Sequence, residues 1–111
     1  MSLSTHVLDA VTGRPAPDLA LTVEQCDGSG AWQLVGHART DADGRARDLL
    51  DDTRPAGVYR LTFDTGAYFA AAGRDTFYPE VSIVFAVSSP GDHHHVPLLL
   101  SPFAYSTYRG S

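Results

Sequence analysis

The sequence contains no lysine, and Cys26 is its single cysteine. A lone cysteine cannot form a disulfide within its chain, which is typical of a reducing compartment, and we expect Cys26 to be a half-buried strand residue. All eight basic residues are arginine, and 13 acidic residues give a net charge of −5. This balance argues against a surface that binds nucleic acid or an anionic membrane.

Long apolar runs are also missing. No stretch of about 18 apolar residues occurs, so no transmembrane helix is expected. The N-terminus has neither the basic nor the apolar region of a secretory signal, which predicts a cytoplasmic protein. The length fits one domain, residues 1–111, that can bury a core without disulfides or a structural metal.

Several catalytic signatures are absent as well. The sequence lacks the Gly-x-Ser-x-Gly turn of serine hydrolases, the glycine patterns of nucleotide-binding loops, and a thiol-protease context around Cys26. The segment 41–44, Asp-Ala-Asp-Gly, lacks the remaining ligands of a calcium loop. It predicts instead a tight turn that presents Arg45 at the start of a strand.

What is present is a series of short β-type stretches separated by Gly, Pro and Asp. The expected strands cover residues 3–9, 19–25, 31–39, 58–64, 81–87, 93–100 and 103–108. Turns are expected at 27–30, where two strands form a hairpin, and at 88–92. The alanine-rich segment 65–73 predicts about two turns of helix, capped by Thr65 and stopped by Gly73. The pattern as a whole predicts an all-β, antiparallel two-sheet sandwich of about eight strands with one short helix.

Histidines in two of the expected strands are the first candidates for chemistry. By alternation, His6 shares a face with Ser4, and His93 and His95 share a face from which His94 points away. A lone strand histidine is most often structural, and a pair of imidazoles can bind metal, transfer protons or simply be exposed to solvent. The residues alone leave these alternatives open.

The C-terminus, from Ser101 to Ser111, is unusual for a chain end. Chain ends are commonly frayed, yet this one is dense in aromatic and hydroxyl side chains up to its last residue. The segment is either a strand with a solvated tail or part of a functional site.

Several segments, taken in order, resemble one known family. They are Ser-Thr-His-Val-Leu-Asp at 4–9, Thr-Gly-Arg-Pro-Ala at 12–16, Thr-Asp-Ala-Asp-Gly-Arg at 40–45, Tyr-Pro-Glu at 78–80, His-His-His-Val-Pro-Leu-Leu-Leu-Ser-Pro at 93–102 and Tyr-Ser-Thr-Tyr-Arg-Gly-Ser at 105–111. The chain is identified as a member of the transthyretin-like family and is similar to its 5-hydroxyisourate hydrolases. The terminal Tyr-Arg-Gly-Ser is the specific part, because it separates these hydrolases from transthyretin, a hormone carrier of the same fold.

The resemblance implies a transthyretin-like (prealbumin-like) sandwich that assembles as a homotetramer, with active sites at the dimer–dimer interface. It implies hydrolysis of 5-hydroxyisourate to 2-oxo-4-hydroxy-4-carboxy-5-ureidoimidazoline in urate degradation, without a metal or other cofactor. The implied catalytic residues are His6, Arg45, His95 and Ser111. The implied substrate-binding residues are His6, Arg45, Tyr108 and Arg109.

The implied chemistry fits these residue types. A histidine that titrates near neutral pH can take a proton from water, and an arginine can stabilise the oxyanion that develops. Whether His6 or His95 is the base stays open. Position 94 is often Tyr in relatives, and we expect His94 to point away from the site. Two alternatives remain: a small-molecule carrier of the same fold, and a metalloprotein that uses His6, His93 and His95 as ligands.

Overall fold

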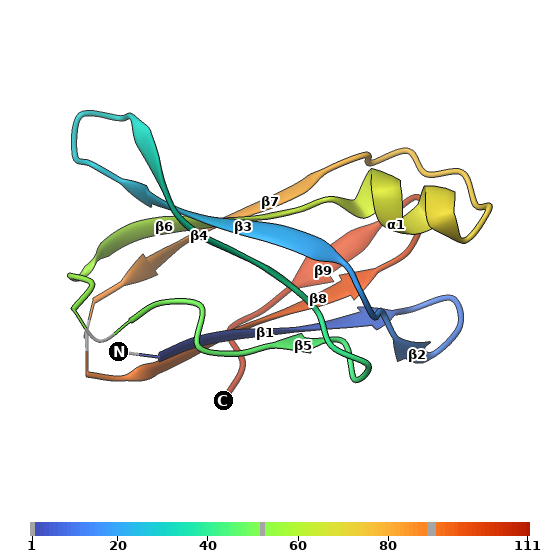
Figure 1. Cartoon of the computed structure of the whole chain (residues 1–111), viewed down its shortest axis with the longest axis horizontal. Coiled ribbons are helices and arrows are strands. Elements are labelled where there is room, and N and C mark those ends of the chain that lie inside the picture. Colours follow the sequence, from blue (N-terminus) through green and yellow to red (C-terminus); the bar gives the residue numbers. More distant parts are fainter. Residues whose placement is uncertain (1, 52, 89–90) are drawn as a thin grey trace.

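The computed structural model describes residues 2–51, 53–88 and 91–111, which form two β-sheets packed face to face (Figure 1). The strands of the first sheet are β1 (Ser2–Asp9), β2 (Arg14–Pro15), β5 (Arg45–Ala46), β8 (His93–Leu100) and β9 (Tyr105–Thr107). Those of the second sheet are β3 (Ala20–Cys26), β4 (Trp32–Arg39), β6 (Gly57–Phe63) and β7 (Val81–Val87). The predicted two-sheet sandwich is confirmed.

The strand order places the two long strands of the first sheet, β1 and β8, at its centre. The first sheet runs β2-β1-β8-β9, with β5 also paired to β1, and the second runs β4-β3-β6-β7. The hairpin of β3 and β4 is confirmed as antiparallel. The β1–β8 pair differs from the antiparallel prediction, because these strands run parallel over eight residues, from Ser2 opposite His93 to Asp9 opposite Leu100.

Three short elements differ from the sequence expectation. The two-residue strand β2 was not predicted, and of β5 only its start at Arg45 was expected, because each strand is defined by its pairing with β1 rather than by a run of β-type residues. The predicted final strand at 103–108 was too long. Ser101 accepts from the Ala104 amide and donates to its carbonyl, so a turn occupies residues 101–104 and β9 begins at Tyr105.

The predicted turn at 88–92 includes Ser89 and Pro90, which lie outside the described residues. Cys26 is half-buried at the end of β3, as expected. In the part of the chain that the structure describes, no helix is long and apolar enough to cross a membrane.

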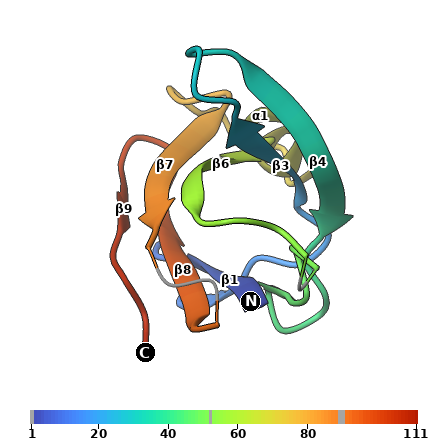
Figure 2. The ribbon, with the colours of Figure 1, turned by 90° about the vertical axis from the view of Figure 1, so that its left-hand side faces the viewer.

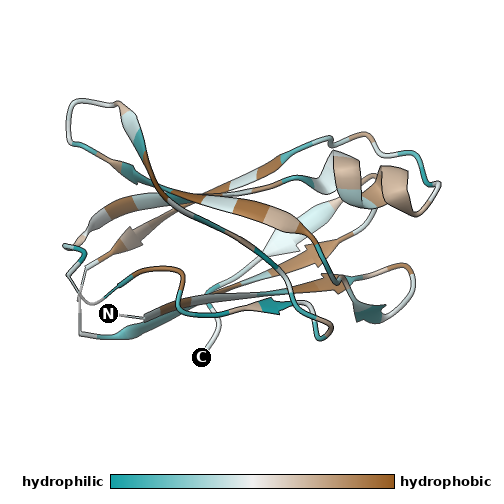
Figure 3. Ribbon diagram, viewed as in Figure 1, coloured by the Kyte–Doolittle hydropathy of each residue, from teal (hydrophilic) through white to brown (hydrophobic). Residues whose placement is uncertain are grey.

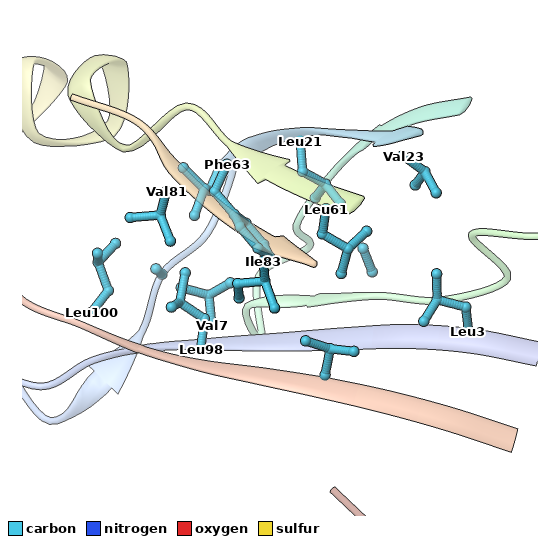
Figure 4. Close-up of a cluster of buried hydrophobic side chains, with 14 of the residues drawn as sticks. Leu3, Val7, Leu21, Val23, Leu61, Phe63, Val81, Ile83, Leu98 and Leu100 are labelled. Carbon is cyan, nitrogen blue, oxygen red and sulfur yellow. The ribbon is translucent and has the colours of Figure 1, made fainter. Parts of the chain in front are cut away.

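The core lies between the two sheets. Its strand residues are the inward-facing ones, which alternate with outward-facing residues along each strand (Figure 4). Val7 of β1 and Leu98 of β8 face Leu61 and Phe63 of β6 across it, and all four are fully buried. Figure 3 shows the same alternation as bands of high and low hydropathy along the strands. Because inward and outward positions alternate, fixing the core also fixes which residues project outward.

The single helix α1 (Thr65–Ala71) covers one end of the sandwich (Figure 1). Its N-terminal cap is Asp64, whose carboxylate accepts from the Ala67 amide, so the prediction of Thr65 as the cap was wrong. Thr65 is buried and its hydroxyl donates to the Tyr78 carbonyl instead. Gly73 follows the helix with φ +68°, which confirms it as the stop.

A buried ion pair attaches the segment after the helix to β1. The Asp9 carboxylate, 1% exposed, lies 2.7 Å from Arg74 Nη1 and accepts from the Tyr68 hydroxyl at 3.1 Å. The amides of Val11 and Thr12 donate to its other oxygen. Burial alone would raise the pKa of Asp9, but the hydrogen bonds from Arg74 and these other donors together hold it below its ordinary value.

Substituting Arg74→Met should therefore destabilise the fold by about 3 kcal/mol at neutral pH, because it leaves a buried carboxylate without its cation. The contribution of the pair is fully present above the unfolded-state pKa of Asp9 and is lost as pH falls through the depressed folded-state pKa, below 3.8. Urea unfolding of both proteins across this pH range measures the difference. The difference in unfolding free energy between the two proteins should become smaller on acidification.

The matched control is Arg39→Met. Arg39 pairs with Asp18 at 3.2 Å, but the two side chains are 62% and 82% exposed. This substitution should change stability by less than about 0.5 kcal/mol. Equal losses of unfolding free energy in the two variants would show that the buried pair contributes no more to stability than the exposed pair.

Candidate active site

The candidate site lies on the outer face of the first sheet, where β5, β1 and β8 run side by side. His6 of β1 is the register partner of Arg45 on β5, and Ser4 of β1 is the register partner of His95 on β8. Thr5, which lies between Ser4 and His6 on β1, points to the opposite face and is fully buried. Strand pairing therefore places three predicted catalytic residues on one face, although they are far apart in the sequence.

The predicted turn before β5 delivers Arg45 to this face. The Asp41 carboxylate accepts from the amides of Asp43 and Arg45, at 2.9 and 3.0 Å. Gly44 has φ +74°, and a Cβ there would overlap the carbonyl oxygen of Val7 on β1. The glycine thus allows the turn to lie directly against β1, which sets the position of Arg45.

The C-terminus lies below the first sheet in the view of Figure 1. The Gly110 amide donates to the His95 carbonyl at 2.9 Å, so the last residue, Ser111, reaches the histidine face. A hollow of about 380 Å³ lies here. It is lined by Ser2, Leu3, Ser4, Arg45, Arg47, Asp48, His93, His95 and Ser111.

Tyr108 and Arg109 occupy a different position. They line a second hollow, of about 260 Å³, between the chain end and β7, together with residues such as Phe85 and His94. Figure 2 shows β9 and the chain end beside β7 and β8, along one side of the sandwich. His95 borders both hollows, but within one chain Tyr108 is not among the residues that line the first.

His95 is the half-buried member of the histidine pair. Its Nδ1 lies 2.8 Å from the Ser4 hydroxyl, and within the part of the chain that the structure describes Nε2 makes no side-chain hydrogen bond. Burial lowers the pKa of His95, and Coulombic repulsion with His93, Arg45 and His6 lowers it further. A lowered pKa keeps this imidazole neutral, and therefore able to act as a base, at neutral pH.

The alternation prediction for the three consecutive histidines is confirmed. His94 points into the sandwich, is 6% exposed, and its Nδ1 lies 3.1 Å from the Asp92 carbonyl. His93 and His95 face outward with their rings stacked, 6.2 Å between centroids and 16° between planes.

Sequence reasoning did not find every residue of this site. Arg47 and Asp48 line the hollow beside Arg45, and Ser4 contacts His95, yet none was a predicted site residue. Alternation puts Ser4 on the face of His6, but its contact with His95 depends on pairing between segments 91 residues apart. Among the described residues, no group of three or more His, Cys, Asp or Glu side chains is placed to hold a metal ion.

Taken together, the fold and the site define a two-sheet sandwich that carries convergent histidine and arginine side chains on the outer face of one sheet. The chain belongs to the HIUase/Transthyretin family, whose pattern matches residues 3–110. It is 46% identical over 110 residues to a 5-hydroxyisourate hydrolase of Salmonella dublin, covering 98% of this chain and 80% of that protein.

Solved structures of this family superpose closely on the chain. A Klebsiella pneumoniae 5-hydroxyisourate hydrolase gives a TM-score of 0.88 with 39% identity and covers all of both chains. Transthyretin from Sparus aurata gives a TM-score of 0.91 with 40% identity, covering 97% of this chain and 95% of the other. The predicted transthyretin-like fold is confirmed, and the backbone alone does not separate the two kinds of protein.

Gly110 provides a test of how the chain end positions His95. A Cβ at Gly110 would overlap Cδ2 of the His95 ring, so Gly110→Ala should displace the ring or the terminal residue. Displacement of a catalytic group by about 1 Å costs up to about 100-fold, and we expect a loss of turnover of that order. Gly91→Ala, where an added Cβ meets nothing within 4 Å, is the matched control. An active Gly110→Ala enzyme would contradict the role of this contact.

Proposed function

We propose that this chain hydrolyses 5-hydroxyisourate to 2-oxo-4-hydroxy-4-carboxy-5-ureidoimidazoline, as one step of urate degradation, within a single domain that spans residues 1–111. The observation that carries the proposal is that His6, Arg45 and His95 share one sheet face, where Arg45, His95 and Ser111 line one hollow and His6 is the register partner of Arg45. The hydrolase names of the Salmonella and Klebsiella relatives support it.

The geometry supports a proposed role for each group. His95, with Nδ1 engaged by Ser4, takes a proton from water through Nε2, and the resulting hydroxide attacks the ring carbonyl carbon. Arg45 stabilises the oxyanion that forms, and His6, its register partner, contacts the same substrate edge. The C–N bond then breaks and the ring nitrogen receives a proton. The Ser111 hydroxyl orients the water, and no metal or cofactor takes part in this scheme.

The assembly that we propose is a homotetramer with its active sites between dimers. Tyr108 and Arg109, the proposed further substrate contacts, line a separate hollow within one chain, so a second copy is needed to complete the site. The strands β7 and β9 are sheet edges, and exposed aromatic residues, Phe103, Tyr105 and Tyr108, lie near the chain end. Such edges and apolar side chains are suited to pairing with another copy.

We propose the cytoplasm as the location, with a small-molecule substrate and no nucleic-acid or membrane partner. The unpaired Cys26 and the net charge of −5 support this part of the proposal.

A carrier function is the second candidate, and the structural similarity to transthyretin favours it. A carrier needs an apolar and hydroxyl-lined channel, whereas the hollow here is lined by Arg45, Arg47 and two imidazoles. Charged and titratable groups of this kind are costly in a site that only binds an apolar ligand.

The decisive assay follows the decay of 5-hydroxyisourate, generated in place by uricase, with and without the protein and after subtraction of the unaided decay. The protein should accelerate the decay, with or without a chelator. Arg45→Ala should lower turnover by about 100- to 1,000-fold, because it removes the oxyanion partner. Arg39→Ala, on the other sheet, is the matched control.

The pH dependence tests the base. His95 acts when neutral, so turnover should hold as pH falls through the ordinary histidine range of about 6.5 and decline only through the lowered pKa of His95. His95→Asn should remove this decline at low pH, together with most of the activity. A folded protein that leaves the decay unchanged would exclude the hydrolase and leave the carrier.

The tetramer is tested by sedimentation, where the mass should be about four times the 11.9 kDa of one chain. If the sites form between dimers, dilution that dissociates the tetramer should lower specific activity in parallel with the mass. A fully active single chain would contradict the proposed assembly.

A further inference from the structure

A row of hydrogen-bonded side chains leads away from His95 on the outer sheet face. The Ser4 hydroxyl lies 2.8 Å from His95 Nδ1 and 3.3 Å from His93 Nε2. The other ring nitrogen of His93, Nδ1, lies 2.6 Å from the Ser2 hydroxyl. The order along the row is therefore His95, Ser4, His93 and Ser2, and the reaction steps described above give no role to the last two.

The register of β1 and β8 builds this row. Ser2 is the partner of His93, and Ser4 is the partner of His95, so each serine stands beside an imidazole on the neighbouring strand. Ser4 is 8% exposed and its hydroxyl bridges both rings, which stack with 16° between their planes. The bridging hydroxyl is thus shielded from solvent, whereas His93, the next group along the row, is exposed.

The chemistry of the groups permits two consistent directions of donation. A hydroxyl has one hydrogen to donate and two lone pairs, and a neutral imidazole has one donor and one acceptor nitrogen. In one direction His95 Nδ1 donates to Ser4, Ser4 donates to His93 Nε2, and His93 Nδ1 donates to Ser2. This direction leaves Nε2 of His95 as an acceptor, which is the state that a base requires.

We propose that Ser4 and His93 form a proton relay that acts through Nδ1 of His95. Both are positioning residues, because they act through His95 and do not touch substrate. This inference rests on the proposed hydrolysis. When His95 Nε2 takes a proton from water, the Nδ1 proton passes to Ser4 and the Ser4 hydroxyl proton passes to His93 Nε2. One proton enters at His95 and the positive charge comes to rest on His93. The transfers reverse when His95 Nε2 protonates the leaving ring nitrogen.

The surroundings of the two imidazoles favour this direction of charge transfer. Around His95 lie His6 and Ser4 from β1, Arg45 from β5, His93 from its own strand, and Arg47, Asp48 and the terminal Ser111 in the same hollow. Burial and the nearby cations lower the pKa of His95, so a lasting positive charge is disfavoured there. His93 is exposed and lies at the rim, where water solvates the charge.

The test uses three variants of the full-length protein: Ser4→Ala, His93→Phe and the double substitution. Phe keeps a flat ring that can stack on His95 but carries no nitrogen. Each single substitution should lower kcat by about tenfold, while KM should change by less than about twofold because neither group contacts substrate. Since both act through one relay, the double variant should be no slower than the slower single variant.

A proton inventory separates the relay from a merely structural effect. In mixtures of light and heavy water, kcat of the unaltered protein should depend non-linearly on the deuterium fraction, because several protons move in one step. The dependence should become linear in Ser4→Ala. In the same variant, nitrogen NMR should show that His95 loses its preference for the Nδ1-protonated tautomer, and this measurement needs no substrate.

His37→Phe is the matched control, because His37 is an exposed histidine on β4 of the other sheet and should leave kcat unchanged. Multiplying losses in the double variant, or a linear inventory in the unaltered protein, would overturn the relay while leaving hydrolysis in place. No hydrolysis by the unaltered protein would instead overturn the proposed function.

Discussion

The parallel pairing of β1 with β8 is the constraint on which the rest of the structure depends. It joins the two ends of the chain over eight register pairs at the centre of one sheet. Its inner face supplies Val7 and Leu98 to the core, and its outer face supplies His6 and His95 to the site. A slip of one residue would exchange the two faces of the shifted strand, so the burial of the core also enforces the geometry of the site.

The same pairing concentrates positive charge on one face of an acidic protein. Arg45 and Arg47 line the hollow with His93 and His95, and Asp48 is the acidic residue among its lining residues. Burial, together with charge repulsion from neighbours such as Arg45, holds the pKa of His95 down, and the arginines are suited to attracting an anionic ligand to the same place. In the proposed mechanism, this one arrangement keeps the base neutral and provides the partner for the developing oxyanion.

Alternation and turn chemistry were enough to predict the features that depend on neighbours in sequence. They gave the inward direction of His94, the turn before Arg45 and the stop at Gly73. They could not give the parallel pairing, the contact of Ser4 with His95, or the two-residue strands, because these depend on segments that meet only in the folded chain. The helix cap failed for a related reason: Thr65 has a cap-forming side chain, but a tertiary bond to the Tyr78 carbonyl holds it instead. The site residues named in advance came from family resemblance, and alternation alone could not select among the histidines.

A sandwich of this family can host a carrier or an enzyme because the residues that determine the fold are separate from those that determine function. The positions that determine the fold point inward and alternate with the positions that determine function, so the outer face can change without a cost in core packing. This explains why a transthyretin and a 5-hydroxyisourate hydrolase both superpose closely on the backbone of this chain. It also means that the chemistry of the outer face, and not the superposition, must decide between them. In this chain that face carries a neutral imidazole beside a guanidinium, joined by a serine to a second, exposed imidazole. Such a set is suited to moving protons, which a carrier does not need.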